Sequence, residues 1–268
     1  MTARTKLKGL LDKGTAAGGL FVSIPSPVLI DIAAVAGFDF ALIDLEHTLI
    51  GGEAIEHMIA AADRAGLSII VRVPDCRSER IVQVLDAGAA GIVVPRCRTA
   101  EDAEAAVQRA RYGPAGGRGL NAGRLGRFGD CDLAALIQTL DRQTLVIAMI
   151  EDEDGLVRVA DIAGVKGVDG LLFGAADYSQ SIDQPWQTGS PAVLAAEQRL
   201  AEAVAGAGKH LFVIPRKAED IARYAKAGAS GIIAANDRGL LRAALSAKNQ
   251  EWRAVVQALR NTTPEPAL

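Results

Sequence analysis

The chain has 268 residues, a formal net charge of −3 and an aromatic content of 4%. A slightly acidic chain lacks the basic surface of a general nucleic-acid binder, and so few aromatic side chains cannot build a base-stacking platform. The three cysteines lie far apart without CxxC spacing, which is typical of a reduced intracellular protein. The sequence shows no signal peptide and no run of about 18 uncharged apolar residues, so we expect a cytoplasmic protein without a membrane span.

Short apolar runs predict eight β-strands along the chain. They cover residues 19–22, 38–44, 68–71, 91–94, 145–150, 170–173, 210–214 and 231–235. These runs are continuous rather than alternating, which indicates strands buried on both faces of a parallel sheet. Three of them follow an Ala-Gly pair, at Ala36, Ala87 and Ala227, in which the glycine ends the preceding helix.

Helical patterns at residues 78–86, 100–111, 192–205 and 218–227 separate these strands. Alternating strands and helices with about eight strands predict a (β/α)8 TIM barrel or a doubly wound sheet. No G-x-G-x-x-G follows the first strand, and a barrel of ~250 residues accounts for the length, so the barrel is preferred. We therefore expect a single α/β domain over residues 1–260 and a flexible tail at 261–268.

Two long segments interrupt the alternation. Residues 113–130 are rich in glycine and arginine, and residues 181–191 contain Pro185, Trp186 and Gly189. Long loops inside compact domains are usually functional or disordered. A functional role is preferred, because neighbouring elements carry the site candidates described next.

Ionisable residues gather where the expected strands end. They are Asp44, Glu46 and His47 after the second strand, Arg72 after the third, Arg96 and Arg98 after the fourth, Glu151 after the fifth and Asp177 after the sixth. In a barrel these carboxyl ends meet on one face. The sequence therefore predicts one converging site.

Glu151 and Asp177 are expected at the ends of adjacent strands. Two carboxylates suit a hard divalent cation, Mg²⁺ or Mn²⁺ and less readily Co²⁺, that takes its other ligands from water and substrate. The alternatives are that Glu151 favours a helix dipole and that Asp177 caps a helix. Before Asp177, the small residues Gly174 and Ala175 would let a backbone N–H approach a ligand closely.

An acid–base pair and two arginines complete the predicted site. Asp44 stands three residues before His47 and could orient its imidazole, although a buried structural histidine is the alternative. Arg72 follows an apolar strand and must meet an anion, either a structural carboxylate or a substrate. Arg96 would add positive charge at the mouth of the site, unless it is an ordinary surface arginine.

Together these residues resemble the HpcH/HpaI aldolase/citrate lyase family of class II pyruvate aldolases. The resemblance extends from about Lys6 to Ala244. Its matching stretches are Gly-Phe-Asp-Phe-Ala-Leu-Ile-Asp-Leu-Glu-His at 37–47, Val-Arg-Val-Pro at 71–74, Leu-Asp-Ala-Gly-Ala at 85–89, Arg-Tyr-Gly-Pro-Ala-Gly-Gly-Arg-Gly at 111–119, Met-Ile-Glu at 149–151 and Val-Asp-Gly-Leu-Leu-Phe-Gly-Ala-Ala-Asp-Tyr-Ser at 168–179.

The resemblance implies a (β/α)8 barrel that assembles as a homo-oligomer, a hexamer or a dimer. It also implies a role for each matching residue: Glu151 and Asp177 as metal ligands, Arg72 on the pyruvate carboxylate or enolate, His47 with Asp44 as the acid–base dyad, and Gly174 and Ala175 as the backbone that holds the keto-acid carboxylate. The implied activity is that of a metal-dependent carbon–carbon lyase. Its substrates would be acidic 2-oxo acids with an aldehyde or acyl partner.

Some stretches depart from the family pattern. Thr48-Leu-Ile replaces the usual Ala-Pro-Asn-Asp after His47, and Arg96, Arg98 and Ile214-Pro-Arg-Lys make the mouth more basic, which indicates a polyanionic partner molecule. Residues 21–27 and Glu-His-Thr at 46–48 also resemble a citrate synthase branch from siderophore pathways, which joins acetyl-CoA to oxaloacetate. A non-catalytic keto-acid-binding barrel is the remaining alternative. Glu46 and the segment 113–130 have no assigned role.

Overall fold

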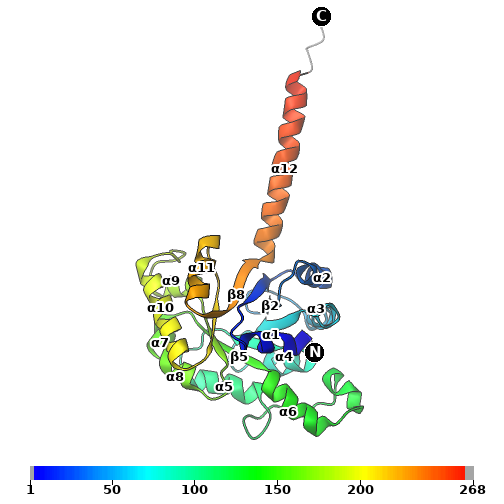
Figure 1. Cartoon of the computed structure of the whole chain (residues 1–268), viewed down its shortest axis with the longest axis vertical. Coiled ribbons are helices and arrows are strands. Elements are labelled where there is room, and N and C mark those ends of the chain that lie inside the picture. The colour runs from blue at the N-terminus through cyan, green and yellow to red at the C-terminus, as the bar shows by residue number, and fades with distance from the viewer. Residues whose placement is uncertain (1–2, 263–268) are drawn as a thin grey trace, which may run out of the picture.

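Eight parallel strands close into a barrel in the computed structural model, which describes residues 3–262 (Figure 1). Each strand pairs with its neighbours in chain order, and β1 closes the ring by pairing with β8. The predicted (β/α)8 TIM barrel is therefore confirmed. The strands are β1 Ala17–Val22, β2 Phe40–Asp44, β3 Ser68–Arg72, β4 Gly91–Val94, β5 Leu145–Ile150, β6 Gly170–Phe173, β7 His210–Val213 and β8 Ala229–Asn236.

Helices alternate with the strands and surround the barrel (Figure 1). Those that follow the first seven strands are α2 Pro27–Val35, α3 Gly52–Ala65, α4 Arg80–Ala87, α5 Ala100–Ala110, α7 Glu153–Val157 with α8 Val159–Gly164, α9 Ala175–Ser181 with α10 Pro191–Gly206, and α11 Ala218–Lys226. Additional elements are α1 Ala3–Leu11, a 3-10 turn at Arg124–Gly129, α6 Leu133–Gln143 and α12 Asp237–Thr262. Across residues 3–262, no helix combines the length and apolar character that a bilayer span requires.

Aromatic rings fill the barrel interior because glycines on neighbouring strands leave room for them. Phe40 and Phe212 are fully buried and meet edge to face, with ring centroids 6.3 Å apart. A Cβ atom on Gly231 would lie 2.2 Å from the ring of Phe212, which no side chain allows. Leu7 and Leu11 of α1 join the same buried cluster and cover one end of the barrel. The opposite end, where the strands finish, is left for the site.

The arginine-rich segment 113–130 packs beside α4, away from the strand ends. Arg118 is buried, pairs with Asp86 of α4 and stacks 4.7 Å over the ring of Tyr112. Asn121 donates a second hydrogen bond to Asp86 at 3.0 Å. Arg118 thus holds the segment 113–130 against helix α4.

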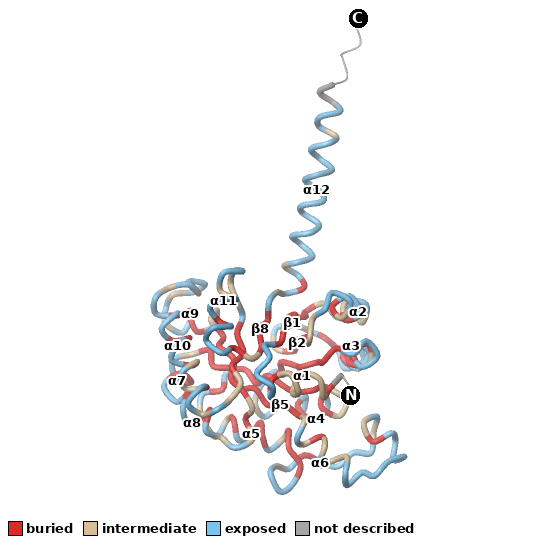
Figure 2. Tube along the Cα trace, viewed as in Figure 1, coloured by how far each residue is buried: buried red, intermediate tan, exposed pale blue. Residues whose placement is uncertain are grey.

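Helix α12 does not return to the barrel, although it follows the last strand. It projects away from the body of the molecule (Figure 1) and is exposed along most of its length (Figure 2). The expected domain boundary at residue 260 falls near its end, and residues 263–268 of the expected flexible tail lie outside the described residues. The tail therefore stays a prediction.

Candidate active site

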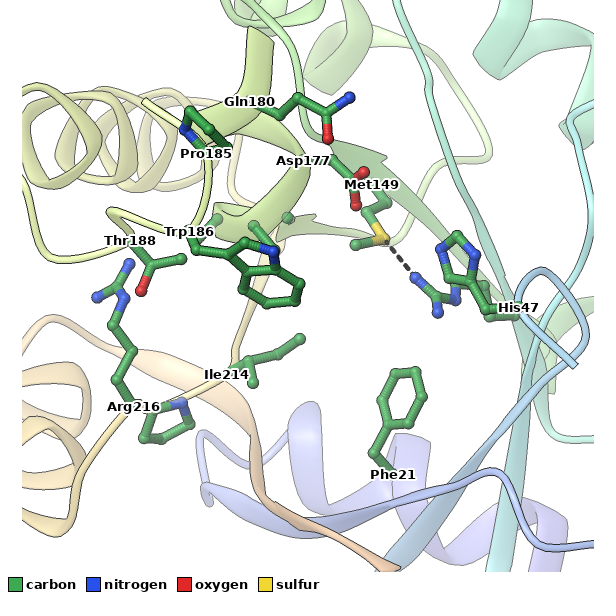
Figure 3. A pocket seen from close by; sticks show the side chains of 15 residues that line it. Phe21, His47, Met149, Asp177, Gln180, Pro185, Trp186, Thr188, Ile214 and Arg216 are labelled. Carbon is green, nitrogen blue, oxygen red and sulfur yellow. Dashed lines mark hydrogen bonds between the residues drawn. The ribbon is translucent and has the colours of Figure 1, made fainter. Parts of the chain in front are cut away.

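A cavity of about 560 Å³ opens at the carboxyl ends of the strands (Figure 3). Side chains and backbone from β1, β3 and β5 line it, together with segments that follow β2, β6 and β7. Five predicted site residues are among the lining residues, namely His47, Arg72, Gly174, Ala175 and Asp177. The segment 181–191 contributes Pro185, Trp186 and Thr188 to the same wall, as a functional loop would.

Arg72 is held in one orientation by carboxylates from the end of β2. Its side chain is 7% exposed, and its Nε donates a 2.8 Å hydrogen bond to Asp44. Its Nη1 lies 3.1 Å from Glu46, and the guanidinium stacks 5.0 Å over the ring of Phe21. A buried guanidinium is stable only with such anionic partners, so the plane of Arg72 is fixed before any substrate arrives.

The structure places Asp44 and His47 with different partners. Asp44 Oδ1 accepts hydrogen bonds from Arg72 Nε and from the Glu46 amide, the latter at 3.0 Å. His47 Nε2 instead lies 3.5 Å from Glu46 Oε2, and the imidazole is half exposed in the cavity. The acid beside the histidine is therefore Glu46, a residue to which the sequence had given no role.

Glu46 contacts three basic side chains at this end of the barrel. Its side chain is 8% exposed and lies 3.1 Å from Arg72, 3.5 Å from His47 and 3.3 Å from Arg96. These are ion-pair distances, although Glu46 Oε2 makes no directed hydrogen bond. A single carboxylate thus lies within ion-pair distance of three basic side chains and links the ends of β2, β3 and β4.

Glu151 is buried at the end of β5 with one oxygen satisfied and one not. Its Oε1 accepts a 2.7 Å hydrogen bond from the backbone N–H of Arg96, and its Oε2 is shielded from solvent without a partner. Arg96 adopts a left-handed backbone with φ of 51°, a conformation that non-glycine residues rarely hold without cause. That conformation accompanies the amide's contact with Glu151, while the Arg96 side chain reaches Glu46.

Gly174 lies directly against Glu151. A Cβ atom there would be 2.7 Å from Glu151 Oε2 and 2.8 Å from the methyl carbon of Met149. Only glycine therefore fits at position 174, where the backbone lines the cavity directly beside Glu151. This close approach explains why a small residue stands at 174, for which the sequence alone gave only weak evidence.

Burial, together with the nearby charges of Glu46 and Asp177, raises the pKa of the Glu151 carboxyl from 4.5 to about 7. The raised pKa records a carboxylate that lacks positive charge close to it, and Asp177 lines the cavity beside it. Such a pair fits a divalent cation. Among residues 3–262, no three His, Cys, Asp or Glu side chains converge as a metal cage, so water or substrate would have to supply the remaining ligands.

The other basic residues near the strand ends have structural partners. Arg98 pairs with Asp152 at the start of α7, and the Arg96 side chain pairs with Glu46. The cavity lining also includes residues to which the sequence analysis gave no individual role, among them Phe21, Met149 and Arg216. Phe21 and Met149 are apolar strand residues and carried no signal, whereas Arg216 belongs to the unusual stretch Ile214-Pro-Arg-Lys.

A family model matches residues 18–244, most of the chain, and its description is HpcH/HpaI aldolase/citrate lyase. The chain belongs to this family. The hydroxypyruvate/pyruvate aldolase of Roseobacter denitrificans is 33% identical to it over 87% of this chain and 91% of that protein. The 2-keto-3-deoxy-L-rhamnonate aldolase of Klebsiella pneumoniae subsp. pneumoniae is 34% identical over 79% of this chain and 80% of that protein.

A solved structure of the citrate synthase SbnG is 38% identical to this chain, with a TM-score of 0.88, and covers 94% of this chain and 99% of that one. As a member of the HpcH/HpaI family with aldolases among its relatives, the chain is an enzyme that works on carbon–carbon bonds, as the sequence predicted. The similarity to this citrate synthase fits the alternative function that the sequence predicted, citrate synthesis on the same barrel fold.

The raised pKa of Glu151 predicts a pH-dependent stability for this family member. The folded chain holds a proton that the unfolded chain releases between the ordinary value of 4.5 and about 7, so the stabilisation is present at low pH and is lost as pH rises through this window. With a chelator present, Glu151→Gln should gain about 1–3 kcal/mol over wild type between about pH 5 and pH 8. Urea unfolding at both pH values measures this difference.

The exposed Glu219 of α11 offers a matched control. Glu219→Gln should show no gain over the same pH range. A constant difference between wild type and Glu151→Gln at both pH values would contradict the assigned environment of Glu151.

Proposed function

We propose that the chain is a metal-dependent aldolase that forms and cleaves a bond to the enolate of a pyruvate-type 2-oxo acid. The observation that carries this proposal is the contrast across one cavity. On one side lies Arg72, fixed by Asp44 and Glu46, and on the other lies Asp177, while the partnerless oxygen of Glu151 is buried against Gly174 of the cavity wall. An enolate with its carboxylate needs both a cationic anchor and a cation held by carboxylates.

Glu151 and Asp177 would hold the divalent cation, which acts as a Lewis acid on the oxygens of the 2-oxo acid when bound. Their all-oxygen character favours Mg²⁺ or Mn²⁺ over Co²⁺. Arg72 lines the cavity with a preset orientation, so it would stabilise the negative charge that develops on the enolate oxygen. Gly174 and Ala175 would let the substrate carboxylate approach the backbone.

His47 would move the proton on the hydroxyl of the partner substrate. Its imidazole lines the cavity, is half exposed and lies 3.5 Å from Glu46, which can stabilise the protonated ring. Asp44 would then act indirectly, since it orients Arg72 and accepts a hydrogen bond from the Glu46 amide. The acid–base pair on this geometry is His47 with Glu46, while Asp44 serves as a positioning residue.

The metal assignment can be tested with Asp177→Asn. Saturating Mn²⁺ should raise the Tm of wild type by about 5 °C or more, and this rise should disappear in the variant. Pyruvate release from a 4-hydroxy-2-oxo acid should fall about 10²-fold in kcat/KM, and chelator should abolish it in wild type. The exposed Asp161 of α8 gives the control Asp161→Asn, which should behave as wild type. An Asp177→Asn variant with full activity and an intact Mn²⁺ shift would remove the ligand assignment.

Citrate synthesis is a second candidate, favoured by the 38% identity to SbnG over 94% of this chain, which exceeds the 33% identity to the first aldolase. It would join the enolate of an acetyl thioester to the keto group of oxaloacetate, with Arg72 binding the keto acid. Both candidates use an anchored 2-oxo acid, so the cavity favours neither reaction direction by itself.

An assay with acetyl-CoA and oxaloacetate separates the two candidates. If the chain is an aldolase, we expect pyruvate-type products from hydroxy-oxo acids and no release of free thiol. Free thiol released in step with citrate, without pyruvate formation from any hydroxy-oxo acid, would replace the aldolase proposal with citrate synthesis. Chromatography of the products together with a colorimetric thiol reagent measures both.

We also propose that the chain works in the cytoplasm as a homo-oligomer. The thiols of Cys76, Cys97 and Cys131 are free, and free thiols persist in reducing compartments. For the oligomer, the supporting feature is α12. Its side chains Leu241, Leu245, Trp252 and Val255 recur at helical spacing and are 51–62% exposed, an apolar stripe that a lone soluble helix would not keep.

The barrel carries a matching stripe on α2. Val28, Ile32 and Val35 are spaced by four and three residues and are exposed by 64%, 58% and 90%. No ring helix follows β8 on the described barrel, because α12 points outward (Figure 1). We infer a two-fold dimer in which α12 of each copy packs against the barrel of its partner, close to α2.

Leu245→Glu should break this dimer, because a charge on the stripe cannot be buried without a partner. Sedimentation should show the wild type as a dimer or larger assembly and the variant as a monomer. Ile32→Glu on α2 should give the same result, whereas Leu120→Glu, at a 78% exposed loop position, should not. A monomeric wild type, or an unchanged assembly in Leu245→Glu, would contradict the inference.

A further inference from the structure

One charged residue in the cavity is not used by the proposed chemistry. Arg216 follows β7 and lines the cavity on the wall opposite His47, beside Thr188 (Figure 3). Its side chain is 21% exposed, and its Nε and Nη2 are shielded from solvent with no hydrogen-bond partner among residues 3–262. Leaving two guanidinium N–H groups unsatisfied is costly, so Arg216 is suited to an anion that the protein itself does not provide.

Arg216 Nη1 donates a 3.4 Å hydrogen bond to the Tyr224 hydroxyl, and the carboxylate that faces it, Glu197, already has other partners. Glu197 Oε2 lies 3.6 Å from Arg216 Nη1 but also 3.4 Å from Arg223 Nη2, and Glu197 Oε1 accepts a hydrogen bond from Tyr224. Arg216 can therefore turn toward the cavity without leaving Glu197 as an unpaired buried charge. Arg223 stays behind as the counter-ion.

An apolar stretch separates the two cationic ends of the cavity. Trp186 and Ile214 lie between Arg216 and His47 in Figure 3, and Phe21 covers Arg72. Trp186 holds a left-handed φ of 64° and is 81% exposed, so the wall beside Arg216 is built from a residue under backbone strain. The cavity thus suits a molecule with an anionic head, a short apolar middle and a second anionic end.

We propose that Arg216 is a specificity-determining residue that binds an anionic group, a carboxylate or a phosphate, at the remote end of the partner substrate. This inference rests on the proposed aldolase function, in which Arg72 takes the 2-oxo acid and leaves the far wall to the partner aldehyde. A planar guanidinium binds either anion through paired N–H donors. A partner without a remote anion would leave Arg216 unsatisfied and would bind more weakly.

Two matched pairs of aldehydes test the proposal with pyruvate as donor. Butanal and 4-oxobutanoate differ by a carboxylate, and glyceraldehyde and glyceraldehyde 3-phosphate differ by a phosphate. Wild type should favour the anionic member of at least one pair, and the pair concerned identifies the anion. In Arg216→Gln this preference in kcat/KM should fall by about 10- to 100-fold, mainly through KM. Arg216→Lys should restore part of it, since the charge remains.

Arg223→Gln is the matched control, because Arg223 shares Glu197 but does not line the cavity. It should keep the preference for the anionic aldehyde. A wild type without any such preference, or an Arg216→Gln variant that retains it, would overturn the proposal.

Exchange of the pyruvate methyl protons with deuterated water, followed by NMR, reports the enolate step separately. If wild type shows no exchange, the aldolase proposal itself fails. Calorimetric binding of succinate and of inorganic phosphate to wild type and Arg216→Gln then still decides whether Arg216 binds anions. Equal affinities in the two proteins would reject the assignment.

Discussion

A buried guanidinium at the end of β3 is the constraint on which the rest of the site depends. Arg72 is held by Asp44 and Glu46, and removing one partner of a buried ion pair costs about 3–5 kcal/mol. Asp44 and Arg72 are also register partners in the β2–β3 ladder. The β2–β3 backbone pairing of the barrel therefore also sets the position of the Arg72 guanidinium.

The acidic residues around the cavity fall into two groups. Asp44 and Glu46 have arginine partners within 3.3 Å, so they hold the architecture together. Glu151 lacks such a partner on one oxygen, and Glu46 and Asp177 add negative charge around it. The cavity thus has arginine side chains on one side and a carboxylate without a cationic partner on the other. A 2-oxo acid chelated to a metal ion could bind across both sides.

Much of this arrangement could be predicted from the sequence. Continuous apolar runs identified all eight strands, and the rule that strand ends converge brought Arg72, Glu151 and Asp177 to one face. The contact of Glu46 with His47 was not predicted, because the sequence shows only that Asp44 and Glu46 both stand near His47 and not which carboxylate faces the imidazole. At a strand end, alternate residues share a side, so Asp44 and Glu46 both reach Arg72. The outward direction of α12 could not be predicted from the sequence either. An apolar stripe on this helix could pack against its own barrel or against the barrel of another copy.

The close approach of Gly174 to Glu151 couples two positions that lie far apart in the chain. A Cβ atom at 174 would fall 2.5 Å from the Cβ of Glu151, so in this geometry position 174 accepts only glycine beside a residue that carries a side chain at 151. A larger residue at 174 therefore requires the ends of β5 and β6 to move apart, and this movement would carry the Glu151 carboxylate out of its present place. The restriction has one direction only, since a change at 151 creates no clash with Gly174.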